Sequence, residues 1–379
     1  MSRRILNIVN EIDNEVLKKQ YEDTKHILEE VDKFIKKKKL LIYGGYALNL
    51  LLPKQKKFYK EFTINDYDCF SKNAKSDAIE LANHLKDLKY EYIKVKKALH
   101  ENTYKIYVDF VQILDITQIS PLLYDTFMDI HNTEKKTSIY KYYKDKYTIV
   151  PFMFLISNLH YELARPSASY YRWDKIYHRL MLITDTIKVP KIAKQLYDVH
   201  HNQINNKILK YAKINNMPIV NEWALQFYIS NFTKISERDH IVFLSKDIEK
   251  TKKDILKMFK NKIDVVQDTH TASIIGNYFS FIHDDGTLLC TVIDVQNDCF
   301  SVTKLKGYTI GSIDTIMYFL YRISLLNHLT TCGLWDIETQ INRIHPEKRL
   351  NKNCYGIAFS LKDVLKKKWK KKLTIKYMN

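Results

Sequence analysis

Apolar and polar positions alternate in two different rhythms at the start of the chain. Apolar residues recur every three or four positions over residues 5–39, which predicts one long helix. A short apolar run at 40–43 then predicts a strand, and Gly44-Gly45 ends it. Helical spacing resumes over residues 46–52, so the pattern indicates a strand, a glycine turn and a helix in direct succession.

A second set of alternating elements follows this turn. Residues 62–70 predict a strand, and residues 76–88 predict a helix that Ser76 would cap. Residues 90–97 and 103–119 predict two further strands, of which the second is long. This order of elements predicts a small mixed sheet with helices packed against it.

The pattern beyond this sheet is first helical and then mixed. We expect strands at 278–283, 288–295 and 299–305 and a helix at 313–325. The chain is thus predicted to have four parts: a helical segment at 1–39, a core with the mixed sheet at 40–120, a helical middle region at 121–235, and a mixed α/β domain with a basic tail at 236–379.

Length and charge favour a multidomain protein that binds a polyanion. A chain of 379 residues is long for one small core, so we expect two or three domains. The formal net charge is +18, and only nine of the 61 basic residues are arginines. A lysine surface suits backbone phosphates, although AT-rich coding would also enrich lysine. Four lysine-rich runs, each typical of a solvated surface, could together steer RNA: 36–39, 54–57, 94–97 and 366–372.

Cysteine usage and hydropathy favour a soluble intracellular protein. The five cysteines are widely spaced and form no C-x-x-C pair, which argues against zinc and against a disulfide framework. We therefore expect free thiols in a reducing compartment. No apolar run is long enough to span a membrane, and no signal-peptide core follows the first residues, so we expect no membrane partner.

The glycine turn is the first candidate binding element. Gly44 and Gly45 lie at a predicted strand-to-helix junction, where glycine lets the backbone approach a ligand closely. The backbone N–H groups of such a turn suit phosphate. Taken alone, a Gly-Gly pair is more often only a turn.

Carboxylates on the predicted strands are the second candidate element. Asp66 and Asp68 are two residues apart, so on a strand both would point to the same face. Two neighbouring carboxylates repel unless a cation lies between them, and hard oxygen ligands favour magnesium. The alternative for an isolated D-x-D is an exposed polar edge. Asp109 and Asp115 both lie in the long predicted strand, and either could supply a third carboxylate for a two-metal site.

Taken together, these motifs resemble the nucleotidyltransferase superfamily founded on DNA polymerase β. Within that superfamily, the residues of these motifs resemble the poly(A) polymerase catalytic subunits of giant viruses, poxviruses and asfarviruses. The resemblance rests on Tyr43-Gly44-Gly45-Tyr46-Ala47-Leu48-Asn49, on Asp66-Tyr67-Asp68, on Thr103–Val108 with Asp115-Ile116-Thr117, and on the segment 161–175.

The resemblance implies an α+β fold with a polymerase-β-like nucleotidyltransferase domain, a helical middle and a second, degenerate nucleotidyltransferase-like α/β domain. It also implies that Asp66, Asp68 and Asp115 are the catalytic metal ligands, because the family motif falls on Asp115 and not on Asp109. Gly44 and Gly45 would contact the nucleotide. Mg²⁺ or Mn²⁺ would be the cofactor and ATP the substrate.

A basic helix face adds candidates for phosphate binding. Arg172, Lys175 and Arg179 share one face of a predicted helix, beside an apolar stripe to which Trp173 belongs as a core residue. Three cations on one ridge suit a triphosphate or an RNA backbone, and we assign Lys175 to the nucleotide and the two arginines to RNA or phosphate. The alternative is a solvated basic surface.

The function implied by the resemblance is template-independent addition of AMP to the 3′ end of mRNA. Single-stranded RNA would be the partner, a homodimer is possible, and the location would be cytoplasmic, in a viral factory or virion. The alternatives are another RNA nucleotidyltransferase, of the CCA-adding or uridylyl type, or a non-catalytic RNA-binding subunit. In the C-terminal domain Ile275-Gly276 lacks a second glycine and no D-x-D follows, so we expect that domain to be non-catalytic.

Overall fold

The computed structural model divides the chain into two compact units. The first comprises residues 1–155 and 186–190, and the second comprises residues 156–185 and 191–379. The four-part division predicted from sequence stays a prediction. The structure describes residues 3–59, 67–98, 100–144, 147–167, 169–189, 206–229, 241–260, 262–267, 272–295, 298–326, 332–341, 344 and 353–356.

A mixed six-stranded sheet organises the first unit, with the strand order β3-β4-β5-β2-β1-β6. The pairs β2–β5 and β1–β6 are parallel, and the other neighbours are antiparallel. Its strands are β1 (Leu41–Tyr43), β2 (Asp68–Ser71), β3 (Lys94–Lys97), β4 (Thr103–Val108), β5 (Val111–Gln118) and β6 (Thr148–Ile149). Its helices are α1 (Arg3–Lys38), α2 (Gly44–Leu50), α3 (Ala74–Asp87), α4 (Pro121–Glu134) and the start of α5 (Phe152–Leu163), with short 3-10 turns at Lys54–Lys56 and Ser138–Tyr140.

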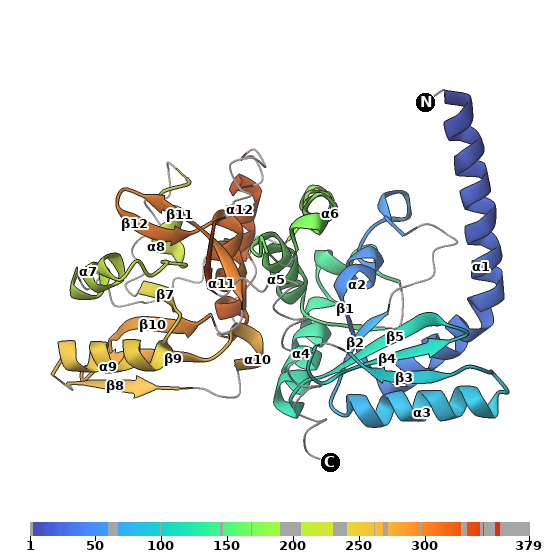
Figure 1. The fold of residues 1–379 in the computed structure, drawn as a ribbon, viewed down its shortest axis with the longest axis horizontal. Coiled ribbons are helices and arrows are strands. Elements are labelled where there is room, and N and C mark those ends of the chain that lie inside the picture. The colour runs from blue at the N-terminus through green and yellow to red at the C-terminus, as the bar shows by residue number, and fades with distance from the viewer. Residues whose placement is uncertain are drawn as a thin grey trace, which may run out of the picture. The chain divides into compact units, whose positions relative to one another are not determined.

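One face of this sheet is closed by helices. The apolar side of α3, with Ala78, Leu81 and Leu85 fully buried, packs along β3, β4 and β5 (Figure 1). Because side chains alternate along a strand, this face takes buried residues such as Ile106 and Ile116. The opposite face therefore presents Asp68 and Asp115. The cap residue of α3 is Asn73, and not Ser76 as the sequence predicted, so the helix begins at Ala74.

The prediction of one long strand over 103–119 is wrong, because this segment forms a hairpin. β4 and β5 pair antiparallel up to Val108 and Val111, and Asp109-Phe110 form the two-residue turn between them. Both turn residues have positive φ, 48° and 66°. That geometry normally selects glycine or asparagine, so no turn signal was visible in the sequence.

Two smaller sheets organise the second unit, with orders β7-β10-β9-β8 and β12-β11-β13. The strands predicted at 278–283 and 299–305 are confirmed, and those predicted at 288–295 and the helix at 313–325 are confirmed to within one residue. The elements after α5 are α6 (Trp173–Thr186), α7 (Asn206–Ile214), α8 (Glu222–Leu225), β7 (Ile241–Ser245), α9 (Ile248–Met258), β8 (Ile263–Val266), α10 (Ala272–Ile275), β9 (Tyr278–His283), β10 (Leu288–Asp294), β11 (Cys299–Leu305), β12 (Tyr308–Gly311), α11 (Ile313–Leu326), α12 (Cys332–Ile341) and β13 (Cys354–Gly356), with a 3-10 turn at Tyr170–Arg172.

The second unit repeats the topology of the first. The elements β7, α9, β8, β9 and β10 correspond in order to β2, α3, β3, β4 and β5. Corresponding strand pairs are both parallel or both antiparallel. Ile219 pairs antiparallel with Phe243 and parallel with Ile310, as Ile42 pairs with Cys69 and Ile149.

A hydrogen-bond motif fixes the register of this repeat. Ser71 is the last residue of β2, accepts a hydrogen bond from the Asn73 N–H at 2.9 Å and donates one to the Asp77 side chain. Ser245 likewise accepts from the Asp247 N–H at 3.1 Å and lies 2.8 Å from the Thr251 hydroxyl. Counting back three residues from each serine places Val242 at the position of Asp68.

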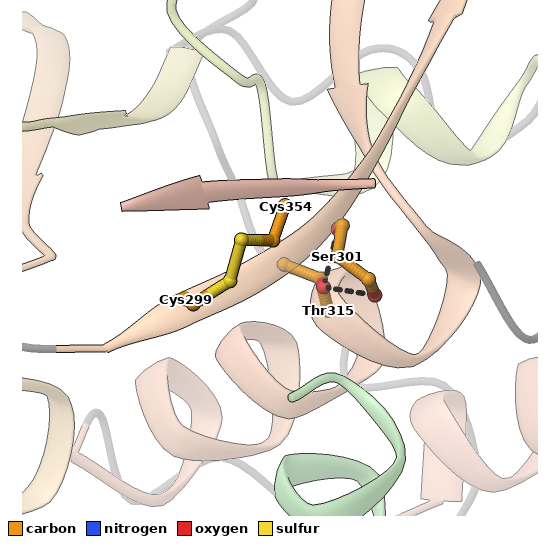
Figure 2. The surroundings of a disulfide bond; sticks show 4 residues. All are labelled: Cys299, Ser301, Thr315 and Cys354. Carbon is orange, nitrogen blue, oxygen red and sulfur yellow. Dashed lines mark hydrogen bonds between the residues drawn. A yellow bond between two sulfur atoms is a disulfide. The ribbon is translucent and has the colours of Figure 1, made fainter. Parts of the chain in front are cut away.

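A disulfide corrects the expectation that all cysteines are free thiols. Cys299 at the start of β11 is bonded to Cys354 of β13, across a separation of 55 residues (Figure 2). Beside the bond, the Thr315 hydroxyl at the start of α11 donates to the Ser301 carbonyl at 2.7 Å. Cys69 and Cys290 are free and buried, as predicted, and the Cys332 side chain lies outside the described residues. Widely spaced cysteines gave no sign that β13 returns to β11.

Among the residues that the structure describes, no helix is both long and apolar enough to cross a membrane.

Candidate active site

Two aspartates from neighbouring strands lie side by side on the face of the first sheet opposite α3. Asp68 of β2 is directly opposite Asp115 of β5 in a parallel pair. Residues paired across a sheet share a face, so the two carboxylates are neighbours. Asp115 is 7% exposed and Asp68 is partly exposed, which places a concentration of negative charge at the margin of the solvent.

The glycine turn lies close to one member of this carboxylate pair, Asp68. Gly44 follows β1 with φ +71°, a left-handed conformation. A Cβ atom added there would lie 2.6 Å from Asp68 Oδ2, well inside van der Waals distance. Gly44 is therefore required both for its backbone conformation and for the room that it leaves beside Asp68. Gly45 is the next residue of α2 and is half-buried.

A lysine that the sequence did not single out completes the charge arrangement. Lys105 of β4 is opposite Asp115, and its Nζ donates to Asp115 Oδ2 at 2.6 Å. The same ammonium donates to Gln112 Oε1 at 3.0 Å, and Tyr107 also donates to that oxygen, at 3.3 Å. The hairpin brings Lys105 next to Asp115. One continuous strand over 103–119 would hold the two residues far apart, so the sequence did not predict this ion pair.

Asn49 is a second residue whose role was not foreseen, although it ends the glycine motif. Its side chain is buried, and Oδ1 accepts from the N–H groups of Phe58 at 2.9 Å and Tyr59 at 3.1 Å. These bonds anchor the chain to α2 shortly before the segment that contains Asp66. Asp66 itself lies outside the described residues.

The apolar end of the same face is packed behind the acids. Tyr43 stacks on Phe70 with ring centroids 4.0 Å apart, and its hydroxyl lies 3.3 Å from Thr117 Oγ1. Burial raises the pKa of the Tyr43 phenol, and the charge of Asp68 adds to the rise. Burial likewise raises the pKa of the Cys69 thiol on the opposite face. Neither group is poised to ionise near neutral pH.

The structure separates the two candidates for a third carboxylate. Asp109 is exposed in the β4–β5 turn, whereas Asp115 lies in the sheet beside Asp68. Among the described residues, no cluster of three histidine, cysteine or acidic side chains has metal-site geometry. Asp66 is not among them, so its part in the predicted set is untested.

The predicted basic ridge lies on α6 in the second unit and is not uniformly exposed. Lys175 is exposed, but Arg179 is buried, and Arg172 Nη1 lies 3.5 Å from Glu162 Oε2. Trp173 is buried, as predicted, and its indole N–H donates to the Glu162 carbonyl at 3.0 Å. The assignment of these cations to nucleotide or RNA stays a prediction.

The second unit lacks the acids at the corresponding positions. Val242 and Thr291 are register partners and stand where Asp68 and Asp115 stand in the first unit. Asn221 precedes α8 at the position of Gly44, so the sequence comparison with Ile275-Gly276, which belongs to α10 and the residue after it, was misplaced. Asp284 and Asp285 lie in the turn between β9 and β10. These replacements agree with a degenerate second copy.

Comparison with known proteins gives relatives of one kind. Residues 29–169 match the family model described as poly(A) polymerase catalytic subunit. A provisionally named poly(A) polymerase catalytic subunit of African swine fever virus (Tick/Malawi isolate) is 38% identical over 100 residues, which are 26% of this chain and 21% of the relative. The Badajoz strain's protein is 26% identical over 271 residues, 67% and 56% of the two chains. The protein of the same description from Acanthamoeba polyphaga mimivirus is 25% identical over 248 residues, 62% and 40%.

A solved structure extends the likeness of fold. The crystal structure of the Megavirus polyadenylate synthase matches with a TM-score of 0.76 and 18% identity, covering 98% of this chain and 83% of that one. The chain spans between about a fifth and about half of the length of these curated relatives. The predicted resemblance is therefore confirmed: residues 29–169 match the model of the poly(A) polymerase catalytic-subunit family, and the chain has the fold of the Megavirus polyadenylate synthase.

Proposed function

We propose that this chain is the catalytic subunit of a viral poly(A) polymerase, which adds AMP from ATP to the 3′ end of RNA without a template. In this reaction the RNA 3′-hydroxyl oxygen bonds to the α-phosphorus of ATP, the hydroxyl loses its proton, and the bond between the α-phosphorus and the bridging oxygen breaks. Pyrophosphate leaves and the RNA is one nucleotide longer. The single observation that carries the proposal is the juxtaposition of Asp68 and Asp115 beside the Gly44 turn.

The residues at this site fit a divalent cation. Two carboxylates in register are the hard oxygen donors that magnesium or manganese prefers, and the Lys105 ammonium already holds a positive charge 2.6 Å from one of them. Asp68 and Asp115, with Asp66, would hold the ions. When bound, such ions supply charge stabilisation for the reacting phosphate and lower the pKa of a coordinated hydroxyl.

The chain's own residues have separate tasks in this proposal. Gly44 keeps the space beside Asp68 clear, so that a phosphate can approach the carboxylates closely. Asn49 fixes the path of the chain toward Asp66, and Lys105 orients Asp115. Lys175, Arg172 and Arg179 are offered as contacts for the triphosphate or RNA. A homodimer and a cytoplasmic viral location belong to the same proposal and rest on the resemblance alone.

A primer-extension experiment tests the function. Purified protein is incubated with a labelled single-stranded RNA and each of the four NTPs separately, with magnesium or with EDTA. We expect ladders with ATP and magnesium only, and none from Asp68→Asn. Extension with CTP or UTP would favour another RNA nucleotidyltransferase, and RNA binding without extension would favour a non-catalytic subunit.

A further inference from the structure

Two aromatic side chains are held in solvent at the tip of the β4–β5 hairpin. Phe110 is 87% exposed and Tyr92, just before β3, is 68% exposed. Their ring centroids are 5.9 Å apart with an interplanar angle of 26°, so they form a stacked pair with outward faces. Large aromatic side chains usually bury most of their area, and the other described exposed hydrophobics are individually less exposed than Phe110.

The backbone beneath this pair is strained. Phe110 has φ +66° and Tyr92 has φ +47°, values that bulky side chains rarely adopt and that glycine adopts without cost. A glycine at Phe110 would suit the turn better, and the exposed ring gains little from burial in return. A persistent unfavourable conformation of this kind indicates a side chain retained for what it contacts outside the fold.

Lysines lie between the aromatic pair and the acids on the same sheet face. Lys96 is paired with Lys105, which is paired with Asp115, and Lys94 is paired with Tyr107. Lys94 and Lys96 are exposed, and Lys96 Nζ lies 5.3 Å from the centre of the Tyr107 ring. Lys96 and Lys105 are directly opposite each other, which is unfavourable in an isolated sheet but suits an anion bound across it.

We propose that Tyr92, Phe110, Tyr107, Lys94 and Lys96 form a platform for single-stranded RNA leading to the acids. Bases stack on the Tyr92–Phe110 pair, and phosphates lie against the two lysines, which is how single strands are held without sequence preference. The direction of the platform rests on the proposed function, which places the 3′ end at Asp68 and Asp115.

The geometry also sets a length requirement. Three residues of β4 separate Lys105, the neighbour of Asp115, from Val108, which is roughly 10 Å, and Phe110 lies beyond Val108 in the turn. At about 3.4 Å per stacked nucleotide, the span from the acids to the aromatic pair therefore exceeds roughly three nucleotides. An RNA much shorter than this cannot occupy the acids and the aromatic pair at once.

The test compares Phe110→Gly with Asn102→Gly. Asn102 has φ +58° in the connection at the other end of β4, so this control relieves similar backbone strain without removing an aromatic ring. Affinity for a 5′-labelled 15-nucleotide oligo(A) is measured by fluorescence anisotropy without ATP or metal, together with the melting temperature. We expect Phe110→Gly to bind at least about fivefold more weakly than Asn102→Gly while melting no lower than the wild type.

Charge gives a further measurement. Lys94→Gln and Lys96→Gln should each flatten the dependence of log affinity on log salt by about 0.7. Equal affinity of the two glycine variants for the 15-mer overturns the platform, as does an unchanged salt dependence in both lysine variants. Tyr92→Gly provides an independent second variant.

These outcomes are separate from the test of the proposed function. Binding is measured without ATP, so a chain that binds through the aromatic pair but never extends RNA overturns the polymerase and leaves the platform standing. A chain that extends RNA normally, with Phe110→Gly binding like its control, overturns the platform and leaves the polymerase standing.

Discussion

Lys105 and Asp115 form an ion pair across the β4–β5 hairpin, with Nζ 2.6 Å from Oδ2, at the point where a metal ligand is proposed. The carboxylate is nearly buried and the lysine is about 30% exposed. A cation of the protein thus neutralises this acid in the chain without metal.

Lys105→Met should make the stability of the first unit depend on divalent ions. Without the ammonium, no cation from β4 offsets the charge of Asp115 beside Asp68. We therefore expect the free energy of unfolding to fall by about 1–2 kcal/mol in EDTA. Manganese should then raise the melting temperature of the variant more than that of the wild type. The matched control is Lys72→Met, whose partner Asp125 is exposed and whose loss should matter little. Equal responses of both variants to manganese would contradict the role of Lys105.

Gly44→Ala should abolish nucleotide addition while leaving a folded protein. The added methyl group would meet Asp68 Oδ2 at 2.6 Å and displace it, and the left-handed backbone adds about 1–2 kcal/mol of strain. Gly286→Ala is the control, because Gly286 has a similar φ of +85° but no atom within 4 Å of the added Cβ. Primer extension should fall at least about 100-fold for the first variant and stay unchanged for the second. Similar activities would show that the contact with Asp68 is unimportant.

Asp115→Asn should be inactive and Asp109→Asn should be active. Asp115 shares the sheet face with Asp68, whereas Asp109 lies in the turn with φ +48°, a conformation that asparagine accepts well. Extension rates at saturating RNA check this, and we expect a loss of at least about 100-fold for the first variant only. A severe loss in Asp109→Asn, with normal melting, would reverse the assignment.

A buried charge network in the second unit should make stability fall at alkaline pH. His160 of α5 lies 2.9 Å from Asp314 Oδ1 and 2.7 Å from Glu338 Oε2, and all three side chains are fully buried. Burial alone would lower the pKa of His160, but the charge of Glu338 and the hydrogen bonds to both acids outweigh it and raise the pKa to about 9.

Because the folded pKa exceeds the unfolded value of about 6.5, the stabilisation is complete below about pH 6.5 and is lost as pH rises through about 9. We expect a loss of about 3 kcal/mol over that window, measured by denaturant unfolding at a series of pH values. His160→Gln should remove this pH dependence, and His178→Gln, an exposed residue, should retain it. A wild-type profile that is flat between pH 6.5 and 9.5 would contradict the charged state of His160.

Reduction should loosen the second unit. The Cys299–Cys354 bond closes a loop across 55 residues, for which chain entropy gives about 4 kcal/mol of stabilisation. The melting temperature should drop in dithiothreitol, and the double variant Cys299→Ala, Cys354→Ala should melt alike with and without it. A wild-type melting temperature that ignores dithiothreitol would exclude a disulfide in solution.

The elements that the sequence predicted well have strong local signals. Alternation in β9 and β11, helical spacing in α1 and α11, and the two glycines that begin α2 are all visible in the sequence. The Asp109-Phe110 turn escaped detection because phenylalanine stands at the second position, where glycine is usual. The register of Lys105 depends on that turn, and the repeat of the fold is hidden because Val242 and Thr291 carry none of the polar signature of Asp68 and Asp115.

The paired positions Asp68–Asp115 and Val242–Thr291 allow the stability of charged and uncharged side chains to be compared at the same place in one fold. One scaffold occurs twice in the same chain, once with two neighbouring carboxylates that repel each other and once with a valine and a threonine that pack without repulsion. The second unit packs apolar and neutral side chains at this place, while the first unit retains two neighbouring carboxylates, of which the Lys105 ammonium offsets one. Reserve stability in this molecule should therefore reside in the second unit, and substitutions at Val242 and Thr291 should be the more readily tolerated.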